Sequence, residues 1–183
     1  MTGFTVPLGF PYPQAADPLD GPAQLQALAE AIDNSMVSTL ASLQGATAPP
    51  CAKVTGTSQN AVSGAGTLMN FNSVYFDNDG MADLVADPQK LTVRTAGVYA
   101  VYAFATFAPN ATAYREVNIR RNGAVLSRWS SNAVNSTLVS LGVGVSGLVS
   151  MSVGDNFDMF TVQVSGVTLP TLDCQLTAFR VSS

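Results

Sequence analysis

The chain has 183 residues, of which 47% are hydrophobic and only 11% are charged, whereas about 25% are charged in an average soluble domain. Its net charge is −4, and no basic stripe is present to neutralise phosphates, which argues against a nucleic-acid partner. No apolar run reaches the roughly 18 residues of a membrane span, and no basic flank of a secretory signal precedes the first apolar residues, so we expect no membrane partner.

Residues 1–22 are predicted to form an extended arm. Five prolines lack amide hydrogens and fix φ, which prevents a helix in this segment. Phe4, Phe10 and Tyr12 recur along it, and an isolated arm has no core in which to bury them. A disordered tail is the alternative, but the aromatic content favours an arm that docks on a neighbouring protein through extended-chain contacts.

Residues 23–45 are predicted to form a stem helix with its stop. Asp20 is the expected N-cap, Pro22 suits the first turn, and Gly45 is expected to end the helix. Apolar residues recur at helical spacing: Leu25, Leu28, Ile32, Met36, Leu40 and Leu43. Because such a helix is marginal alone, the stripe packs either on its own β-domain or against sister chains. A short parallel three-helix stem is favoured, since no Glu/Lys ladder supports a long two-stranded zipper.

Residues 46–60 are rich in Ala, Pro, Thr, Gly and Ser and are predicted to be a linker, and residues 61–183 a β-domain. From Ala61 onward the apolar period changes to two, and turn signals recur about every ten residues, which is typical of a sandwich or barrel. Asn122-Gly123 supplies the positive φ values of a type I′ hairpin turn.

One predicted strand, residues 98–107, is apolar on both faces. Side chains alternate across a strand, and this places Tyr99, Val101 and Phe107 on one face. Tyr102 and Phe104 lie on the other face. Because a sandwich strand needs only one buried face, we expect Tyr102 and Phe104 to lie in a subunit interface.

Few residues are suited to catalysis or to binding a metal. The chain has no histidine, which removes Ser-His-Asp and Cys-His nucleophile systems and His-ligated zinc. We therefore expect no enzymatic activity and no cofactor; a catalytic carboxylate pair is a minor alternative. Asp77, Asp79 and Asp83 form a weak calcium candidate, but Tyr75 and Ala86 break the EF-hand pattern, which favours a surface turn.

Trp129 and Arg128 are a candidate ligand patch for glycan or protein contact. Packing of Trp129 in the core or in an interface is the favoured interpretation. Cys51 and Cys174 are far apart in the sequence and are expected to be free thiols, although the sequence leaves a bridge open.

Several segments resemble the tumour-necrosis-factor-like jelly roll, which includes the globular heads of complement component one-q. The resemblance covers about residues 61–183, and it implies a jelly-roll β-sandwich whose inner sheet has a core face and a face toward a threefold axis. The matching segments, in chain order, are Lys90-Leu91-Thr92-Val93 with Ala96-Gly97-Val98-Tyr99-Ala100-Val101, Ile119-Arg120-Arg121-Asn122-Gly123, Leu148-Val149-Ser150-Met151-Ser152-Val153-Gly154-Asp155 and, loosely, Thr177-Ala178-Phe179-Arg180-Val181.

The arm and helix resemble the N-terminus of many tailed-bacteriophage fibre and appendage proteins, through Gly9-Phe10-Pro11-Tyr12-Pro13, Asp17-Pro18 and the helix from Leu25 to Asp33. In those proteins the segment joins a trimeric head to the particle. The resemblance implies a homotrimeric virion structural protein: a capsid fibre, decoration protein or minor tail protein, assembled in the host cytoplasm. Its arm would bind other virion proteins.

The alternative function is a receptor-binding module of a phage tail fibre that adsorbs to a host-surface glycan or protein. A depolymerase is disfavoured by the absence of histidine and the small size of the chain. Whether the protein sits on the head or the tail is left open by the sequence.

Overall fold

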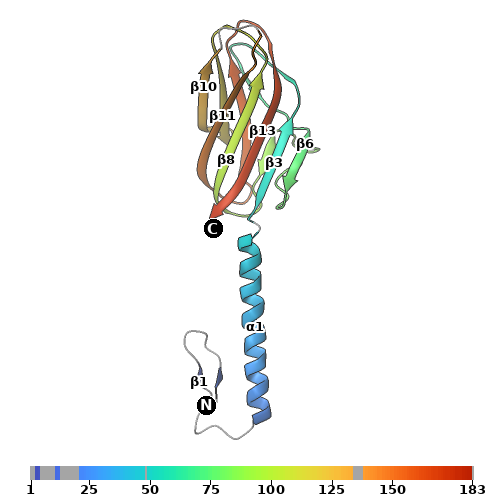
Figure 1. The fold of residues 1–183 in the computed structure, drawn as a ribbon, viewed down its shortest axis with the longest axis vertical. Coiled ribbons are helices and arrows are strands. Elements are labelled where there is room, and N and C mark those ends of the chain that lie inside the picture. The colour runs from blue at the N-terminus through green and yellow to red at the C-terminus, as the bar shows by residue number, and fades with distance from the viewer. Residues whose placement is uncertain (1–2, 5–10, 13–20, 48, 134–137, 183) are drawn as a thin grey trace. The chain divides into compact units, whose positions relative to one another are not determined.

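The computed structural model describes residues 3–4, 11–12, 21–47, 49–133 and 138–182 (Figure 1). The chain divides into two compact units, Met1–Ala48 and Pro49–Ser183. No helix in the described part of the chain combines the length and the apolar character needed to cross a membrane.

In the first unit, the helix α1 (Gly21–Thr47) is longer at both ends than predicted. Pro22 lies in its first turn, where a missing N–H breaks no hydrogen bond. Gly45 does not end the helix, because a glycine inside a helix costs only about 1 kcal/mol relative to alanine. The helix instead stops just before Pro49, since the residue preceding a proline disfavours helical geometry. The predicted N-cap, Asp20, lies outside the described residues.

The arm is not fully extended in its described residues. Strand β1 (Gly3–Phe4) pairs antiparallel with β2 (Pro11–Tyr12), so the chain folds back on itself, and β2 contacts α1. A proline is tolerated in so short a pair because it occupies an edge position. Phe10 lies outside the described residues, and only the backbone is described for Phe4 and Tyr12.

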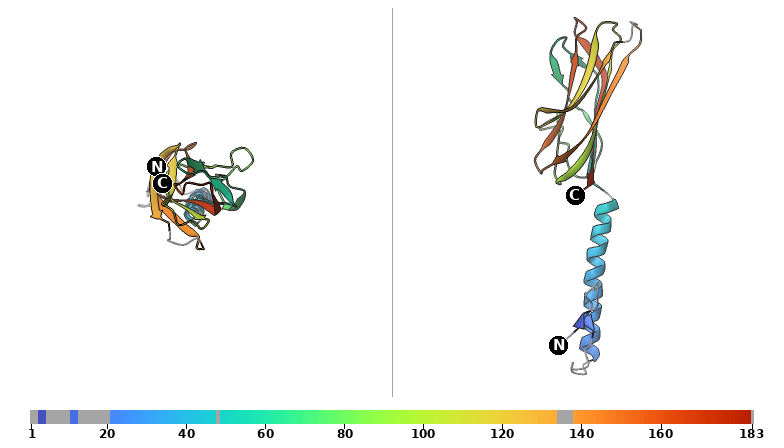
Figure 2. Two further views of the ribbon diagram at one scale, coloured as in Figure 1. Left: turned by 90° about the horizontal axis from the view of Figure 1, so that it is seen from above. Right: turned by 90° about the vertical axis from the view of Figure 1, so that its left-hand side faces the viewer.

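The second unit is a sandwich of two antiparallel sheets, seen from further directions in Figure 2. The first sheet has the order β11 (Leu141–Met151), β8 (Gly97–Phe107), β13 (Leu169–Ser182), β3 (Cys51–Gly56) and β6 (Ser73–Asp77), and β4 (Gln59–Ala61) pairs with the start of β13. The second sheet has the order β10 (Ala124–Asn132), β9 (Tyr114–Arg121), β12 (Asn156–Gln163) and β5 (Gly66–Leu68), and β7 (Lys90–Thr92) also pairs with β12. The predicted fold class, a mainly β jelly roll with one helix, is confirmed.

The prediction of a linker over residues 46–60 is wrong. Cys51–Gly56 is strand β3, paired with β13, and Gln59–Ala61 is strand β4. Ala52 and Val54 are fully buried, while Lys53 and Thr55 point to the opposite face of the sheet. The jelly-roll unit therefore begins at Pro49 rather than at residue 61.

The core lies between the two sheets and confirms the predicted alternation of β8. Tyr99, Val101 and Phe107 are at most 1% exposed, and the Tyr99 hydroxyl donates a hydrogen bond to the Thr95 carbonyl at 2.6 Å. The predicted hairpin turn is also confirmed: Asn122 has φ 50° and Gly123 has φ 80°, between β9 and β10.

The two cysteines are free, and their register rules out a bridge within the chain. Cys51 is paired with Phe179, whereas Cys174 is paired with Gly56, at the other end of β3. The thiols are thus about five residues apart along the sheet, or roughly 17 Å at about 3.4 Å per residue, which is too far for a disulfide.

Candidate functional site

The first sheet carries an apolar surface on the side away from the core. We call it the outer apolar face, and its residues are Ala100, Tyr102, Phe104, Leu148 and Phe179. Leu148 is 68% exposed and Phe179 44% exposed, while Tyr102 retains 37%. Large apolar side chains gathered on one sheet face at such exposure mark an interaction surface. Tyr102 and Phe104 therefore lie on the face where the alternation placed them.

The shape of the outer apolar face follows from the strand register. Leu148 and Phe179 lie on either side of Ala100, on β11 and β13. Because alanine is short, the row of three has a hollow at its centre, and a groove of about 420 Å³ runs between the leucine and the phenylalanine. We call this the Ala100 groove.

Tyr102 and Phe104 do not stand upright on the sheet but lean over β11. A Cβ added at Gly144 would lie 2.8 Å from the Tyr102 Oη, and one added at Gly142 would lie 2.8 Å from the Phe104 Cζ. The two glycines thus provide the space in which the rings lie. The aromatic rings flatten this part of the face instead of projecting from it.

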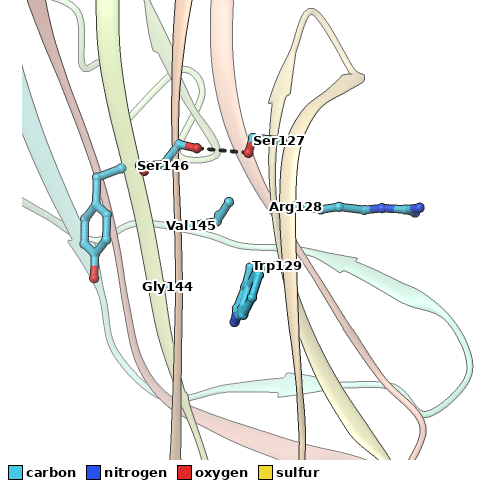
Figure 3. A pocket seen from close by; sticks show the side chains of 7 residues that line it. Ser127, Arg128, Trp129, Gly144, Val145 and Ser146 are labelled. Atoms are coloured by element: carbon cyan, nitrogen blue, oxygen red, sulfur yellow. Dashed lines mark hydrogen bonds between the residues drawn. The ribbon is translucent and has the colours of Figure 1, made fainter.

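A second exposed aromatic lies at the neighbouring edge of the sandwich, where β10 faces β11. Trp129 is 61% exposed and borders a cleft of about 390 Å³, together with Tyr102 and Ser146. The Ser127 hydroxyl donates a hydrogen bond to the Ser146 carbonyl at 2.9 Å across this edge (Figure 3). Of the two favoured interpretations of Trp129, packing in the core is wrong, because the side chain lies at an open edge where few neighbours cover it. Packing in an interface stays a prediction.

The structure separates the two side chains of the predicted ligand patch. Arg128 and Trp129 are neighbours on one strand, so they point to opposite sides of it. Figure 3 shows the indole directed toward β11 and the guanidinium directed away. Arg128 is among the residues that line the cleft, but a ligand stacked on the Trp129 ring would not meet its side chain.

The stem helix presents the predicted stripe to solvent. Four of its residues are exposed, Leu25 by 68%, Ile32 by 39%, Met36 by 57% and Leu40 by 54%. Leu28 is half-buried, and the side chain of Leu43 lies outside the description. The described side chains of the stripe are therefore largely uncovered within one chain.

The acidic residues of the weak calcium candidate stabilise a turn. The Asp77 carboxylate accepts hydrogen bonds from the backbone amides of Asp79, Met81 and Ala82. Asp83 accepts the amide of Ala86 at 3.0 Å. These carboxylate oxygens are already occupied, and within the described residues no three acidic or thiol side chains are placed to hold a metal ion.

The sequence analysis does not place Leu148 and Phe179 on the outer apolar face. Each residue directly follows one that faces the core side, as Phe179 follows Ala178. Strict alternation along the strand could therefore have assigned both to the outer face. Their meeting around Ala100 depends on the order β11-β8-β13, which joins strands distant in the sequence.

Comparisons with known proteins agree on the fold. The sequence matches no protein family and no curated protein. Three similar solved structures are the globular domain of zebrafish complement 1qA (16% identity, TM-score 0.53), the Eiger TNF of S. frugiperda (11%, 0.54) and murine APRIL (13%, 0.55). They cover 72%, 74% and 72% of this chain, and 97%, 95% and 99% of their own. At these identities the likeness shows a TNF- and C1q-like jelly roll and nothing beyond the fold.

Proposed function

We propose that this chain is a homotrimeric structural protein without enzymatic activity. The observation that supports this proposal is that one chain bears two exposed apolar surfaces, the outer apolar face and the stripe of α1. Another copy of the same chain presents both at once and can cover both. Exposed patches of this kind destabilise an isolated monomer in water and favour association.

Three copies are favoured over two for two reasons. The jelly-roll family that the sequence resembles directs this face toward a threefold axis. The stripe of α1 also lacks the Glu/Lys ladder of a long two-stranded zipper, and a short three-helix stem covers it from two sides.

We further propose that the trimer belongs to a tailed-bacteriophage particle, as a capsid fibre, decoration protein or minor tail protein. The support is the resemblance of the arm and helix to phage appendage proteins. In this proposal the arm, through Phe4, Phe10 and Tyr12, binds another virion protein, and the jelly roll projects from the particle.

Deletion of residues 1–20 tests the anchoring role. The truncated chain should remain a soluble trimer but fail to join particles in a complementation assay. A milder variant replaces Phe4, Phe10 and Tyr12 with serine, and its matched control replaces Thr2, Thr5 and Gln14 with serine. Incorporation of the truncated or the aromatic-to-serine protein at the control level would contradict the proposal.

A second candidate function is recognition of a host-surface glycan. The observation that favours it is the exposed indole of Trp129 beside a cleft bordered by Ser127 and Ser146, because sugar rings stack on aromatic faces and bond to polar groups. Adsorption of the purified protein to host cells, lost in Trp129→Ala, would support this function. Equal adsorption by the variant would exclude the cleft as the receptor site.

A further inference from the structure

A cyclic trimer imposes a requirement on the outer apolar face. In a threefold ring each interface is heterologous, so a patch on one subunit contacts a different patch on the next. The outer apolar face therefore needs a complement elsewhere on the same chain. This reasoning rests on the proposed trimer.

The edge formed by β10 and β11 has the properties expected of the patch that contacts the outer apolar face. Trp129 there is 61% exposed, although tryptophan is a residue type that binding interfaces use to bury large areas. The Trp129 cleft is also continuous with the Ala100 groove, since Tyr102 and Ser146 border both. The two patches are thus neighbours on one subunit, and in a closed ring the cleft of one subunit can meet the groove of the next.

The opposite edge of the first sheet is the competing complement. Tyr75 on β6 is 75% exposed, but the Lys53 ammonium lies 5.0 Å from the centre of its ring. Burying Tyr75 would also remove water from this cation, which is costly without a partner. The structure shows no charged side chain over the Trp129 ring among the described residues that border its cleft.

We propose that Trp129 of each subunit inserts into the Ala100 groove of the next subunit, between Leu148 and Phe179. The groove is an apolar hollow with a short residue at its floor, and the indole is a large, rigid apolar group. Insertion would cover both the exposed leucine and the exposed indole, so each interface would contain one such contact.

Trp129 is the only tryptophan of the chain, so its fluorescence reports on this contact alone. In the full-length trimer we expect emission at short wavelength and protection from acrylamide. On dilution to monomer the emission should shift to longer wavelength and acrylamide quenching should rise, in step with the fall in mass measured by light scattering.

Substitutions distinguish the edge that carries Trp129 from the edge that carries Tyr75. Trp129→Ala should raise the trimer dissociation constant by about 30-fold or more, as expected for a central interface aromatic. The matched control, Tyr75→Ala, should change it by less than about threefold. Both residues are exposed, and circular dichroism should show that both variants keep the fold.

The outcomes distinguish this inference from the proposed function. A trimer whose Trp129 stays as accessible to acrylamide as in the monomer would overturn the inference and leave the trimer standing. Dissociation caused by Tyr75→Ala rather than by Trp129→Ala would overturn it too. A chain that is monomeric at every concentration overturns the proposed trimer and the inference with it.

Discussion

Asp158 and Arg120 form an ion pair at the second sheet, on strands β12 and β9. The Asp158 side chain is 2% exposed and that of Arg120 20%, and Arg120 Nη2 lies 3.0 Å from Asp158 Oδ2. The guanidinium also lies over the Phe160 ring, 4.6 Å from its centre. Removing one partner of a largely buried pair leaves the other uncompensated.

We therefore expect Asp158→Asn to lower the free energy of unfolding by about 3 kcal/mol, measured by urea denaturation with the oligomeric state held constant. The control is Asp87→Asn, whose partner Lys90 is on the surface and contributes under about 1 kcal/mol. Equal losses in the two variants would contradict this account.

The Asp155 carboxyl group makes the free energy of unfolding depend on pH in the acidic range. A hydrogen bond from the Asn122 side chain, one from the Ser152 amide and the nearby Arg121 lower the pKa of Asp155 from 3.8 to about 2. Because the folded pKa is depressed, the contribution is complete above about pH 4 and is lost as pH falls toward 2. Asp155→Asn should thus destabilise the protein at pH 5 and much less at pH 2. A difference between wild type and variant that stays constant over this range would contradict the assignment.

At the residue scale, the sequence predicts which face a side chain occupies better than how deeply it is buried. Alternation correctly placed Tyr99 in the core and Tyr102 on the other face. It could not predict the exposure of Trp129, which is paired with the buried Val117 yet lies on an edge strand. Burial there depends on what covers the edge of the sandwich, and the residues of β11 that border the Trp129 cleft leave the indole 61% exposed.

At the scale of elements, the stem helix α1 has an apolar stripe that its own chain leaves largely exposed. Ile32 and Met36 lie on its exposed stripe, whereas Asn34 lies on the opposite side of the helix. We expect Ile32→Asp with Met36→Asp to weaken the trimer, because two carboxylates would be buried among three helices. Asn34→Asp, which adds a carboxylate on the far side, is the control. Sedimentation at graded concentrations measures the effect, and equal behaviour of the two variants would show that the stripe does not join subunits.

The elements themselves were predictable where turn chemistry and apolar alternation agreed. The Asn122-Gly123 hairpin and the strand β8 are examples. Strand β3 was missed because its buried residues, Ala52, Val54 and Gly56, are mostly small, which made the segment resemble a linker. The predicted helix end is wrong because α1 continues through Gly45 to Thr47 and stops only before Pro49.

At the scale of the whole molecule, a substitution at Tyr102 tests the position of the proposed threefold axis. Tyr102→Asp would place a carboxylate on the outer apolar face of each of three subunits. Burial without a partner raises the pKa of a carboxyl group, so the charged form should separate the subunits at neutral pH and the protonated form should let them reassociate in part near pH 4. The control is Tyr114→Asp, at a tyrosine that is also 37% exposed but lies on β9 of the second sheet. A Tyr102→Asp protein that is trimeric with unchanged melting would contradict the placement of the interface.

The proposal of an oligomer starts from one strand, β8, because two apolar faces cannot both lie in one core. The surface proposed as its complement could not be predicted from the sequence, since the edge where β10 faces β11 combines residues from two sheets. The arm's role rests on resemblance, because its aromatic side chains lie outside the described residues.

The most direct test of the central claim is the mass of the purified full-length chain by light scattering at micromolar concentration. We predict three times 19.0 kDa, because the proposed association of three copies would cover both the outer apolar face and the stem stripe. A well-folded protein with a mass of 19.0 kDa at that concentration would contradict it.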